Sequence, residues 1–423
     1  MRFLYNLTTY LLLLPFAIYW IVRVSFNENY RPKLGQRFGF GYPKFEECIW
    51  IHAVSVGEVV AAAPLIRALL RDYPQSKLLV STVTPTGAAR VRSLFGDRVE
   101  HCYIPFEAPF SINRFYRAVR PVIALIMETE IWPNLYRGCG IRGIPLVLVS
   151  ARISPRSVGS YRRLLPLFRE TLSHGIVIAA QSAADAERFL SLAANPERTR
   201  VTGNIKFDIE LPHDLAERGA ALRADVFGDR PVWIAASTHD REEEMVLDAH
   251  EKLRESIPDL LLVLVPRHPE RFSVVREIMQ KRQTKFVART DGMRCTAETS
   301  VFLGDTMGEV TLFYSASDVA FVGGSLVPIG GHNLLEPAAV GVPIVTGPHV
   351  FNAQETADYL KSANACRILH DENELALAIR ELLENPQLAE SFTVNGRQIL
   401  EENRGALARL LGLIRPLIKL KNG

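Results

Sequence analysis

The 423-residue sequence lacks the motifs of several common kinds of site. Its five cysteines are dispersed and form no CxxC pair, which favours reduced thiols over a disulfide framework or a zinc site. Residues 138–143 do spell GxGxxG, but they precede an apolar run instead of following one directly, so the dinucleotide-binding fingerprint is missing. A large excess of one charge is also absent, since 49 basic residues face 46 acidic ones and the formal net charge is +3. Nucleic acid is therefore not the partner that this composition favours.

The length and the apolar runs indicate two α/β domains. A single core stops growing at about 250–300 residues, and this chain is longer. After an opening stretch at residues 48–58, apolar runs lie at 77–83, 122–127, 145–149 and 175–179, and a second set lies at 231–236, 260–265, 300–303, 319–322 and 343–345. Regular βαβ spacing of this kind is typical of parallel sheets with helices on both faces. We therefore expect two Rossmann-like domains facing one another across a cleft.

The expected domains follow from these patterns. They are an anchor at residues 1–28, a first Rossmann-like domain at 29–212, a second at 213–400 and an amphipathic tail at 401–423. We expect the tail to pack back on the first domain.

The anchor is predicted from residues 3–24, which are mainly apolar and as long as a membrane span. Trp20 and Arg23 suit the membrane interface, whereas Pro15 and the polar residues 6–9 weaken a span and keep a helix lying in one leaflet as the alternative. A cleaved signal peptide is a further alternative, although no Ala-X-Ala site follows the segment. The basic residues that come next predict that the body of the protein stays in the cytoplasm.

Glu58 is the first candidate for chemistry. The apolar run from Cys48 ends in a small-residue turn, Ser55-Val-Gly-Glu58, and a helix-like segment follows. A strand-to-helix turn lies at the carboxyl edge of a parallel sheet, where open α/β folds bind their ligands. Two interpretations stay open at this point, a catalytic carboxylate and a carboxylate that only complements the helix dipole.

The glycine-rich stretch 323–331 is the second candidate. It follows an apolar strand and leads into His332-Asn-Leu-Leu-Glu336, which can begin a helix. Free N–H groups at such a helix start favour an anion such as phosphate, and the carboxylate of Glu336 can accept hydrogen bonds from ribose hydroxyls. The alternatives are a tight turn needed for packing and a glutamate that only supports the helix.

At these residues the sequence resembles a known family. The glycine loop with His-Asn-Leu-Leu-Glu looks like the donor-binding region of GT-B glycosyltransferases. Several further motifs resemble the transferases of 3-deoxy-D-manno-oct-2-ulosonic acid (Kdo) in lipid A assembly, and they run in order along nearly the whole chain. These motifs are residues 55–58, 84–87, 127–134, 203–208, 265–271 and 304–309.

The resemblance implies an activity and a place. Members of this family transfer Kdo from CMP-Kdo to a lipid A precursor at the cytoplasmic face of the inner membrane. It implies that Glu58 is the general base of an inverting displacement, and that Glu128, in Met-Glu-Thr-Glu130, lies at the acceptor side. Between Glu128 and Glu130 the backbone either continues as a strand, with both side chains on one face, or turns and separates them.

The resemblance also places CMP in the second domain. Arg267 and His268 follow an apolar run, and a guanidinium can bind phosphate bidentately. The further expected contacts are Met307, Gly308, Glu309, Asn333, Leu334, Leu335 and Glu336, with Ser237 near the phosphate and Lys206 near the phosphate or the Kdo carboxylate. No Asp-X-Asp occurs, so we expect a metal-independent enzyme without a cofactor.

Other interpretations remain. Another anchored GT-B glycosyltransferase, a GT-B sugar-nucleotide epimerase and a catalytically silent membrane scaffold would share the fold. Near the second domain's first strand, Asp240 and residues 242–244 are expected to be a capped, solvated first helical turn rather than a metal cluster. The oligomeric state and the number of Kdo residues transferred do not follow from the sequence.

Overall fold

The structure is a computed structural model that describes residues 1–26, 31–163, 165–173, 175–209 and 211–420. It divides into two compact units, Met1–Asp208 with Asn403–Gly423, and Ile209–Glu402. The division falls between Asp208 and Ile209, whereas the sequence patterns placed it between residues 212 and 213. The anchor boundary expected at residue 28 lies outside the described residues.

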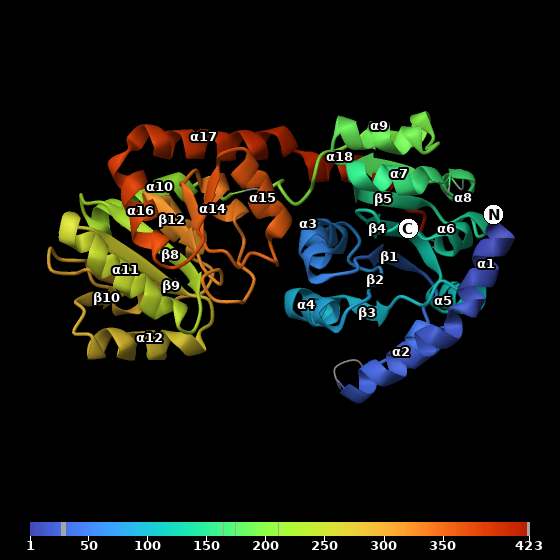
Figure 1. The fold of residues 1–423 in the computed structure, drawn as a ribbon, viewed down its shortest axis with the longest axis horizontal. Coiled ribbons are helices and arrows are strands. Elements are labelled where there is room, and N and C mark those ends of the chain that lie inside the picture. Colours follow the sequence, from blue (N-terminus) through green and yellow to red (C-terminus); the bar gives the residue numbers. More distant parts are fainter. Residues whose placement is uncertain (27–30, 164, 174, 210, 421–423) are drawn as a thin grey trace. The chain divides into compact units, whose positions relative to one another are not determined.

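The first unit is built on a parallel sheet of seven strands in the order β3-β2-β1-β4-β5-β6-β7 (Figure 1). Its strands are β1 (Cys48–His52), β2 (Leu78–Thr82), β3 (Glu100–Tyr103), β4 (Pro121–Met127), β5 (Leu146–Ala151), β6 (Val177–Ala180) and β7 (Thr199–Val201). Its helices are α1 (Arg2–Leu11), α2 (Leu13–Phe26), α3 (Val56–Asp72), α4 (Pro85–Phe95), α5 (Pro109–Val119), α6 (Pro133–Ile141), α7 (Pro155–Arg163), α8 (Leu165–Leu172), α9 (Ala183–Ser191) and α18 (Ala406–Ile414).

Alternation along the central strands creates two cores in this unit. On β1, Ile49 and Ile51 face a core shared with α3, α4 and α18, while Cys48 and Trp50 face a core shared with α5, α6 and α9. Successive strand residues point to opposite faces. A strand that is covered on both sides therefore appears in the sequence as a continuous apolar run.

The carboxyl-terminal helix α18 belongs to the first unit. Asp208 accepts hydrogen bonds from the N–H groups of Gly405 at 3.0 Å and Leu407 at 2.7 Å, at the start of α18. Leu410 and Ile414 lie in the core beside α3. A carboxylate at a helix start is favourable, so Asp208 fixes the point at which the chain returns to this unit.

The second unit repeats the architecture with the order β10-β11-β9-β8-β12-β13-β14. Its strands are β8 (Val232–Thr238), β9 (Leu261–Pro266), β10 (Phe286–Ala288), β11 (Val301–Leu303), β12 (Val319–Val322), β13 (Ile344–Thr346) and β14 (Cys366–Ile368). Its helices are α10 (Leu215–Leu222), α11 (Glu242–Ser256), α12 (Glu270–Lys281), α13 (Val310–Ser315), α14 (Leu335–Val340), α15 (Gln354–Ser362), α16 (Glu374–Glu384) and α17 (Pro386–Asn403), which ends at the unit boundary. One core of this unit includes α11 and α16, and the other includes α10 and α13.

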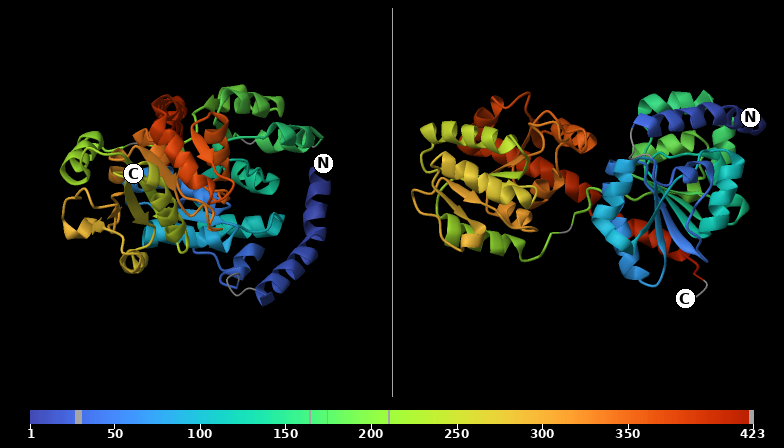
Figure 2. Two further views of the ribbon diagram at one scale, coloured as in Figure 1. Left: turned by 60° about the vertical axis from the view of Figure 1, so that its left-hand side comes forward. Right: turned by 90° about the horizontal axis from the view of Figure 1, so that it is seen from below.

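Two amino-terminal helices, α1 and α2, run along the outside of the first unit in both views of Figure 2. The inward positions of α1 carry polar side chains, Arg2, Tyr5, Asn6 and Thr9, whereas its apolar side chains point outward. Phe3 is 82% exposed. This polarity is the reverse of that of an ordinary surface helix, whose apolar face is the one that packs on the protein.

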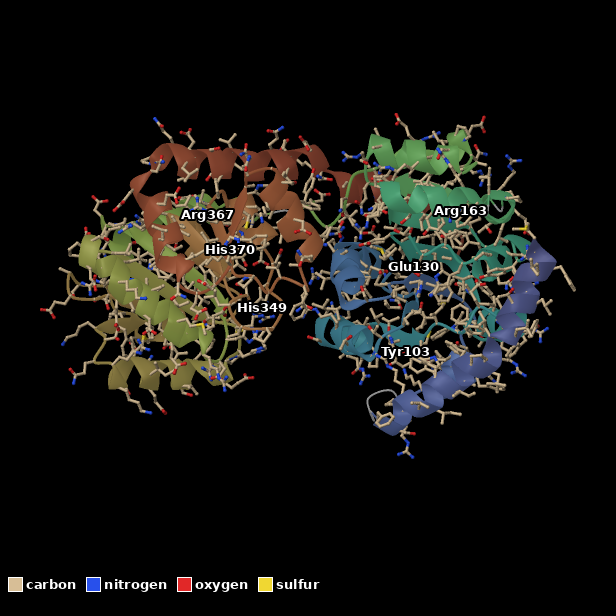
Figure 3. The ribbon with its side chains drawn as sticks, viewed as in Figure 1. Tyr103, Glu130, Arg163, His349, Arg367 and His370 are labelled. Atoms are coloured by element: carbon tan, nitrogen blue, oxygen red, sulfur yellow. The ribbon has the colours of Figure 1, made fainter. Side chains whose placement is uncertain are left out.

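Aromatic contacts attach α2 to the same unit. Phe16 stacks on Phe106 with ring centres 4.3 Å apart. The buried guanidinium of Arg37 lies 3.7 Å from the ring centre of Trp20 and 4.3 Å from that of Tyr103, which is labelled in Figure 3. Stacking of this kind stabilises a cation between two rings. By length and composition the helical stretch Arg2–Phe26 is also long and apolar enough to cross a membrane.

Candidate active site

In the first unit the strand order reverses between β1 and β4. These strands are hydrogen-bonded neighbours, with His52 paired to Ile126. After β1 the chain continues to β2 on one side, and after β4 it continues to β5 on the other. Open parallel sheets bind ligands at the carboxyl ends of the strands where the order reverses. Glu58 follows β1 and Glu128 follows β4, so both candidates lie at this point of the sheet.

The carboxylate of Glu58 is held by the loop that precedes it. Ser55 is the N-cap of α3, and its Oγ accepts a hydrogen bond from the Glu58 N–H at 3.5 Å. Val54 N–H donates to Glu58 Oε2 at 2.8 Å. Reciprocal bonds of this kind satisfy free N–H groups at a helix start. Glu58 therefore does support the helix, and the same contact fixes its carboxylate at the reversal of the strand order.

The surroundings make Glu58 an unusually basic carboxylate. Burial raises its pKa to about 8, while the hydrogen bond from Val54 lowers it. The charges of Glu128 and Glu130 raise the pKa further, and Arg152 lowers it. A carboxylate whose pKa lies close to the working pH accepts a proton more readily than an ordinary glutamate.

The loop after β4 turns and separates its two glutamates. Glu128 has a positive φ of 54°, and its Oε2 pairs with Arg152, whose terminal nitrogen lies 2.9 Å away. Glu130, labelled in Figure 3, accepts a hydrogen bond from Trp132 Nε1 at 2.6 Å instead. Of the two arrangements that the sequence left open, the turn is the one found. Burial raises the pKa of Glu130 as well.

The corresponding point of the second unit is organised by Glu242. This side chain, at the start of α11, is fully buried, and it accepts hydrogen bonds from the N–H groups of His239 at 3.2 Å and of residues 324–326 at 2.7 to 3.0 Å. The expectation of a solvated turn is wrong for Glu242 and for Glu243, which is also buried and pairs with Arg271 at 3.0 Å. Glu242 joins the loop after β8 to the glycine loop after β12.

Two glycines of that loop are required by close contacts. A Cβ at Gly323 would lie 2.7 Å from Glu242 Oε2. Gly324 has a φ of +67°, and a Cβ there would lie 2.9 Å from the His332 ring. Only glycine adopts such a backbone without strain and leaves this space open. The glycine loop is thus shaped around Glu242 and His332.

Three histidines lie close together at the carboxyl edge of the second unit's sheet. His239 Nε2 lies 2.7 Å from His332 Nε2 with the ring planes 2° apart, and the ring of His268 meets that of His239 edge-on at 5.3 Å. Burial lowers the pKa of His239, and the neighbouring charges of His268 and Arg267 lower it further. The sequence predicted Arg267 and His268 as contacts but did not predict His239. His239 lies directly after β8, the strand that contains the predicted Ser237.

The expected nucleotide residues after β12 form one connected turn. Asn333 Oδ1 accepts a hydrogen bond from Leu335 N–H at 3.1 Å, and Asn333 Nδ2 donates to Glu336 Oε1 at 3.1 Å. Leu334 and Leu335 are buried, so their side chains support the turn. Burial raises the pKa of Glu336, and the charge of Arg267 lowers it, which brings the loops after β9 and β12 into electrostatic contact.

The segment after β11 offers its backbone rather than its carboxylate. Glu309 is paired with Arg289 at 2.9 Å and accepts a hydrogen bond from Thr306 Oγ1 at 2.5 Å, and its pKa is lowered chiefly by the bond from Arg289. Met307 is exposed, and Gly308 has a φ of +85° with open space around it. Any contact of this segment with the cytosine base of CMP, which the resemblance implies, would therefore be made by main-chain groups.

The last two ligand contacts predicted from the sequence, Ser237 and Lys206, lie in different units. Ser237 is the irregular residue of β8, with a φ of 59°, at the place where pairing with β9 shifts. Lys206 lies in the first unit, where its N–H donates to Asn204 Oδ1 at 3.0 Å.

Within the part of the chain that the structure describes, no group of three or more His, Cys, Asp or Glu side chains is arranged to hold a metal ion. Metal independence stays a prediction.

Comparison with known proteins assigns both units. Residues 32–209 match the family model described as 3-deoxy-D-manno-octulosonic-acid transferase (kdotransferase), and residues 234–399 match glycosyl transferases group 1. A 3-deoxy-D-manno-octulosonic acid transferase of Haemophilus influenzae is 42% identical over 398 residues, which cover 93% of each chain. That of Bordetella pertussis is 36% identical over 86% of each chain. The crystal structure of the C-terminal CMP-Kdo binding domain of WaaA from Acinetobacter baumannii is 37% identical, covers 45% of this chain and all of that one, and gives a TM-score of 0.43.

The two parallel-sheet units, with candidate residues at each reversal of strand order, define a glycosyltransferase with the two Rossmann-like domains of the GT-B fold. Within that class, the chain belongs to the Kdo transferase family. The resemblance stated from the motifs is thereby confirmed, and a transferase is favoured over the epimerase and the scaffold.

The basicity of Glu58 predicts a pH dependence. If Glu58 is the general base that the resemblance implies, the transfer rate should rise with pH around 8, as Glu58 loses its proton. In Glu130→Gln a nearby negative charge is gone, so ionised Glu58 is repelled less, its pKa falls and the rise moves to lower pH. Rate profiles between pH 6 and 9 measure this shift. Glu197→Gln, an exposed change in the same unit, should leave the midpoint in place; an equal shift in both variants would refute the assignment.

Glu242→Gln should destabilise the second unit. A glutamine has one acceptor oxygen and turns an amide N–H₂ toward backbone donors, so at least one buried N–H group loses its partner. The expected loss is about 1–3 kcal/mol in the free energy of unfolding, together with weaker binding of the CMP that the resemblance places in this unit. Urea unfolding and calorimetric titration measure both, with the exposed Glu244→Gln on the same helix as the control. Native stability in Glu242→Gln would contradict the role given to this carboxylate.

Proposed function

We propose that this enzyme transfers Kdo from CMP-Kdo to a hydroxyl of a lipid A precursor at the cytoplasmic face of the inner membrane, with inversion at the anomeric carbon. The observation that carries the proposal is Glu58, a carboxylate with a pKa of about 8 held at the strand-order reversal of the first unit. Membership of the Kdo transferase family supports the transferred sugar.

The chemical step that we propose is a single displacement. The acceptor hydroxyl is a poor nucleophile, so Glu58 takes its proton as the new bond forms between the acceptor oxygen and the anomeric carbon. The bond from that carbon to the phosphate oxygen breaks, and CMP leaves from the opposite face. Val54 N–H engages Glu58 Oε2, so Oε1 is the oxygen that receives the proton.

Glu128 has a supporting role in this proposal. Its ion pair with Arg152 keeps one carboxylate oxygen in place beside Glu58, and its charge is one of those that raise the pKa of Glu58. We assign it to the acceptor side, where it can accept a hydrogen bond from the incoming sugar. Through its electrostatic effect it also keeps the base strong.

We place CMP at the strand-order reversal of the second unit. Arg267 supplies positive charge, and His268 and the His239–His332 pair supply ring N–H donors, at the carboxyl ends of β8, β9 and β12. Such donors can balance the charge of a departing phosphate without a metal ion. The nucleoside would meet the turn Asn333–Glu336 and the backbone of residues 307–309, and Lys206 of the first unit would contact the phosphate or the Kdo carboxylate.

We further propose that α1 and α2 attach the enzyme to one leaflet rather than crossing the bilayer. The polar face of α1 packs on the first unit, and α2 is fixed there through Phe16 and Trp20. To span the membrane, these helices would have to leave the folded unit and lose these contacts. Its outward apolar side chains, including Leu11 and Leu14, suit the lipid boundary.

The transfer reaction itself tests the proposed function. Native protein, CMP-Kdo, a tetra-acylated lipid A precursor and a chelator should give CMP release and a lipid product heavier by Kdo. Glu58→Gln should lose at least about 100-fold in rate, the contribution typical of a general base, while its affinity for CMP stays native. Absence of CMP release by the native chain would reject the substrate pair, and full activity in Glu58→Gln would reject the base.

Labelling with a membrane-impermeant maleimide tests the attachment. A cysteine placed before Met1 in a Cys295→Ala background should react in inverted inner-membrane vesicles, where the cytoplasmic side faces outward, and should stay unreactive in intact spheroplasts. Cys295 is removed because it is the native thiol with a partly exposed side chain among the five described. Reaction in spheroplasts alone would show that the helix spans the bilayer.

A further inference from the structure

A second helix start in the first unit is held by a buried carboxylate from another segment. Glu107, which is 8% exposed, accepts hydrogen bonds from the N–H groups of Asn134 at 3.1 Å and Leu135 at 2.8 Å, in the first turn of α6. Asn134 Nδ2 donates in return to the Glu107 carbonyl oxygen at 2.8 Å. Glu107 thus fixes the position at which α6 begins.

The same carboxylate is bound by the amino-terminal helix. Tyr5 of α1 donates its phenolic O–H to Glu107 Oε2 at 2.8 Å. One turn earlier, Arg2 donates to Asn134 Oδ1 at 3.3 Å and pairs with Glu170 of α8. The polar face of α1 therefore meets the start of α6, and the ribbon shows the two helices on the same side of the first unit (Figures 1 and 2).

The start of α6 is also the end of the acceptor-side loop. Trp132 is the N-cap of α6, its Nε1 holds Glu130, and its ring lies 6.0 Å from that of His52 at the end of β1. The other end of this loop carries Glu128. The charges of Glu128 and Glu130 act on Glu58. A displacement of the α6 start would therefore change both the shape of the loop and the field at the base.

We propose that Glu107 is a positioning residue that couples the seating of the amino-terminal helix to the geometry of the acceptor loop, residues 128–132. With α1 seated, the phenol of Tyr5 completes the set of donors around the Glu107 carboxylate, and α6 and Trp132 hold the loop in its working shape. When α1 leaves, that set is incomplete and the loop loses its fixed end. This inference rests on the proposed function for the role of the loop.

The charge on Glu107 agrees with this role. Burial raises its pKa to about 7, and the bonds from Leu135, Tyr5 and Asn134 and the charge of Arg2 lower it. Loss of the Tyr5 hydroxyl would raise the pKa again, so near neutral pH a larger share of Glu107 would be protonated. A neutral carboxyl is a weaker partner for two N–H groups at a helix start.

Two matched substitutions on α1 test the coupling in the full chain. Tyr5→Phe removes only the hydroxyl that reaches Glu107, whereas Tyr10→Phe makes the same change at a half-exposed ring that stacks on Phe110. For Tyr5→Phe we expect kcat/KM for the lipid precursor to fall about tenfold, with an unchanged KM for CMP-Kdo. Amide hydrogen exchange over residues 128–141 should become faster. Tyr10→Phe should match the native enzyme in both measurements.

A double substitution distinguishes coupling from simple loss of stability. If the effect of Tyr5 passes through Glu107, then Tyr5→Phe should add little to Glu107→Gln in exchange and in turnover. Additive effects, native exchange in Tyr5→Phe, or equal effects of Tyr5→Phe and Tyr10→Phe would overturn the proposal. If the native chain transfers nothing to the lipid precursor, the proposed function fails, while the exchange data still decide whether α1 holds the loop.

Discussion

Carboxylates that accept hydrogen bonds from backbone N–H groups are the interaction on which both units depend. The half-buried Glu58 binds Val54 N–H just before α3, and the buried Glu107 binds two N–H groups in the first turn of α6. The buried Glu242, at the start of α11, binds the N–H groups of His239 and of the glycine loop. Burial raises the pKa of all three, and the hydrogen bonds offset much of the cost of that burial. Glu107 and Glu242 thereby join segments far apart in the sequence, and Glu58 gains a fixed place and a raised basicity from the same contact.

The parallel sheets decide where such carboxylates become useful. In each unit the first strand lies beside the strand at which the order reverses, so the loops that follow these two strands begin next to each other at the carboxyl edge of the sheet. The inner strands were predicted because burial on both faces makes them continuous apolar runs. The outermost strands β3, β7, β10 and β14 were missed, since they are short and have polar residues or too few apolar ones to stand out. The layer architecture could therefore be predicted from the sequence, but the outermost strands of the sheets could not.

The site was predictable only in part, for a related reason. Glu58 and Arg267 follow strong apolar runs, so their place at a sheet edge could be inferred from local sequence. Glu242 looked like one of three solvated glutamates because its partners, residues 324–326, are about eighty positions away. Glu107 gave no local signal either, as its partners lie on α1 and α6. The local sequence does not show contacts between distant segments, and these contacts supply the hydrogen-bond donors of the buried carboxylates.

The most direct test of the account is the anomeric configuration of Kdo in the lipid product, determined by nuclear magnetic resonance and compared with that of CMP-Kdo. A single displacement, with Glu58 accepting the proton of the attacking hydroxyl and CMP leaving from the opposite face, predicts the inverted configuration. Retention of configuration would require a second displacement or attack from the side of the leaving group. That result would contradict the role of Glu58 as the general base of a single step.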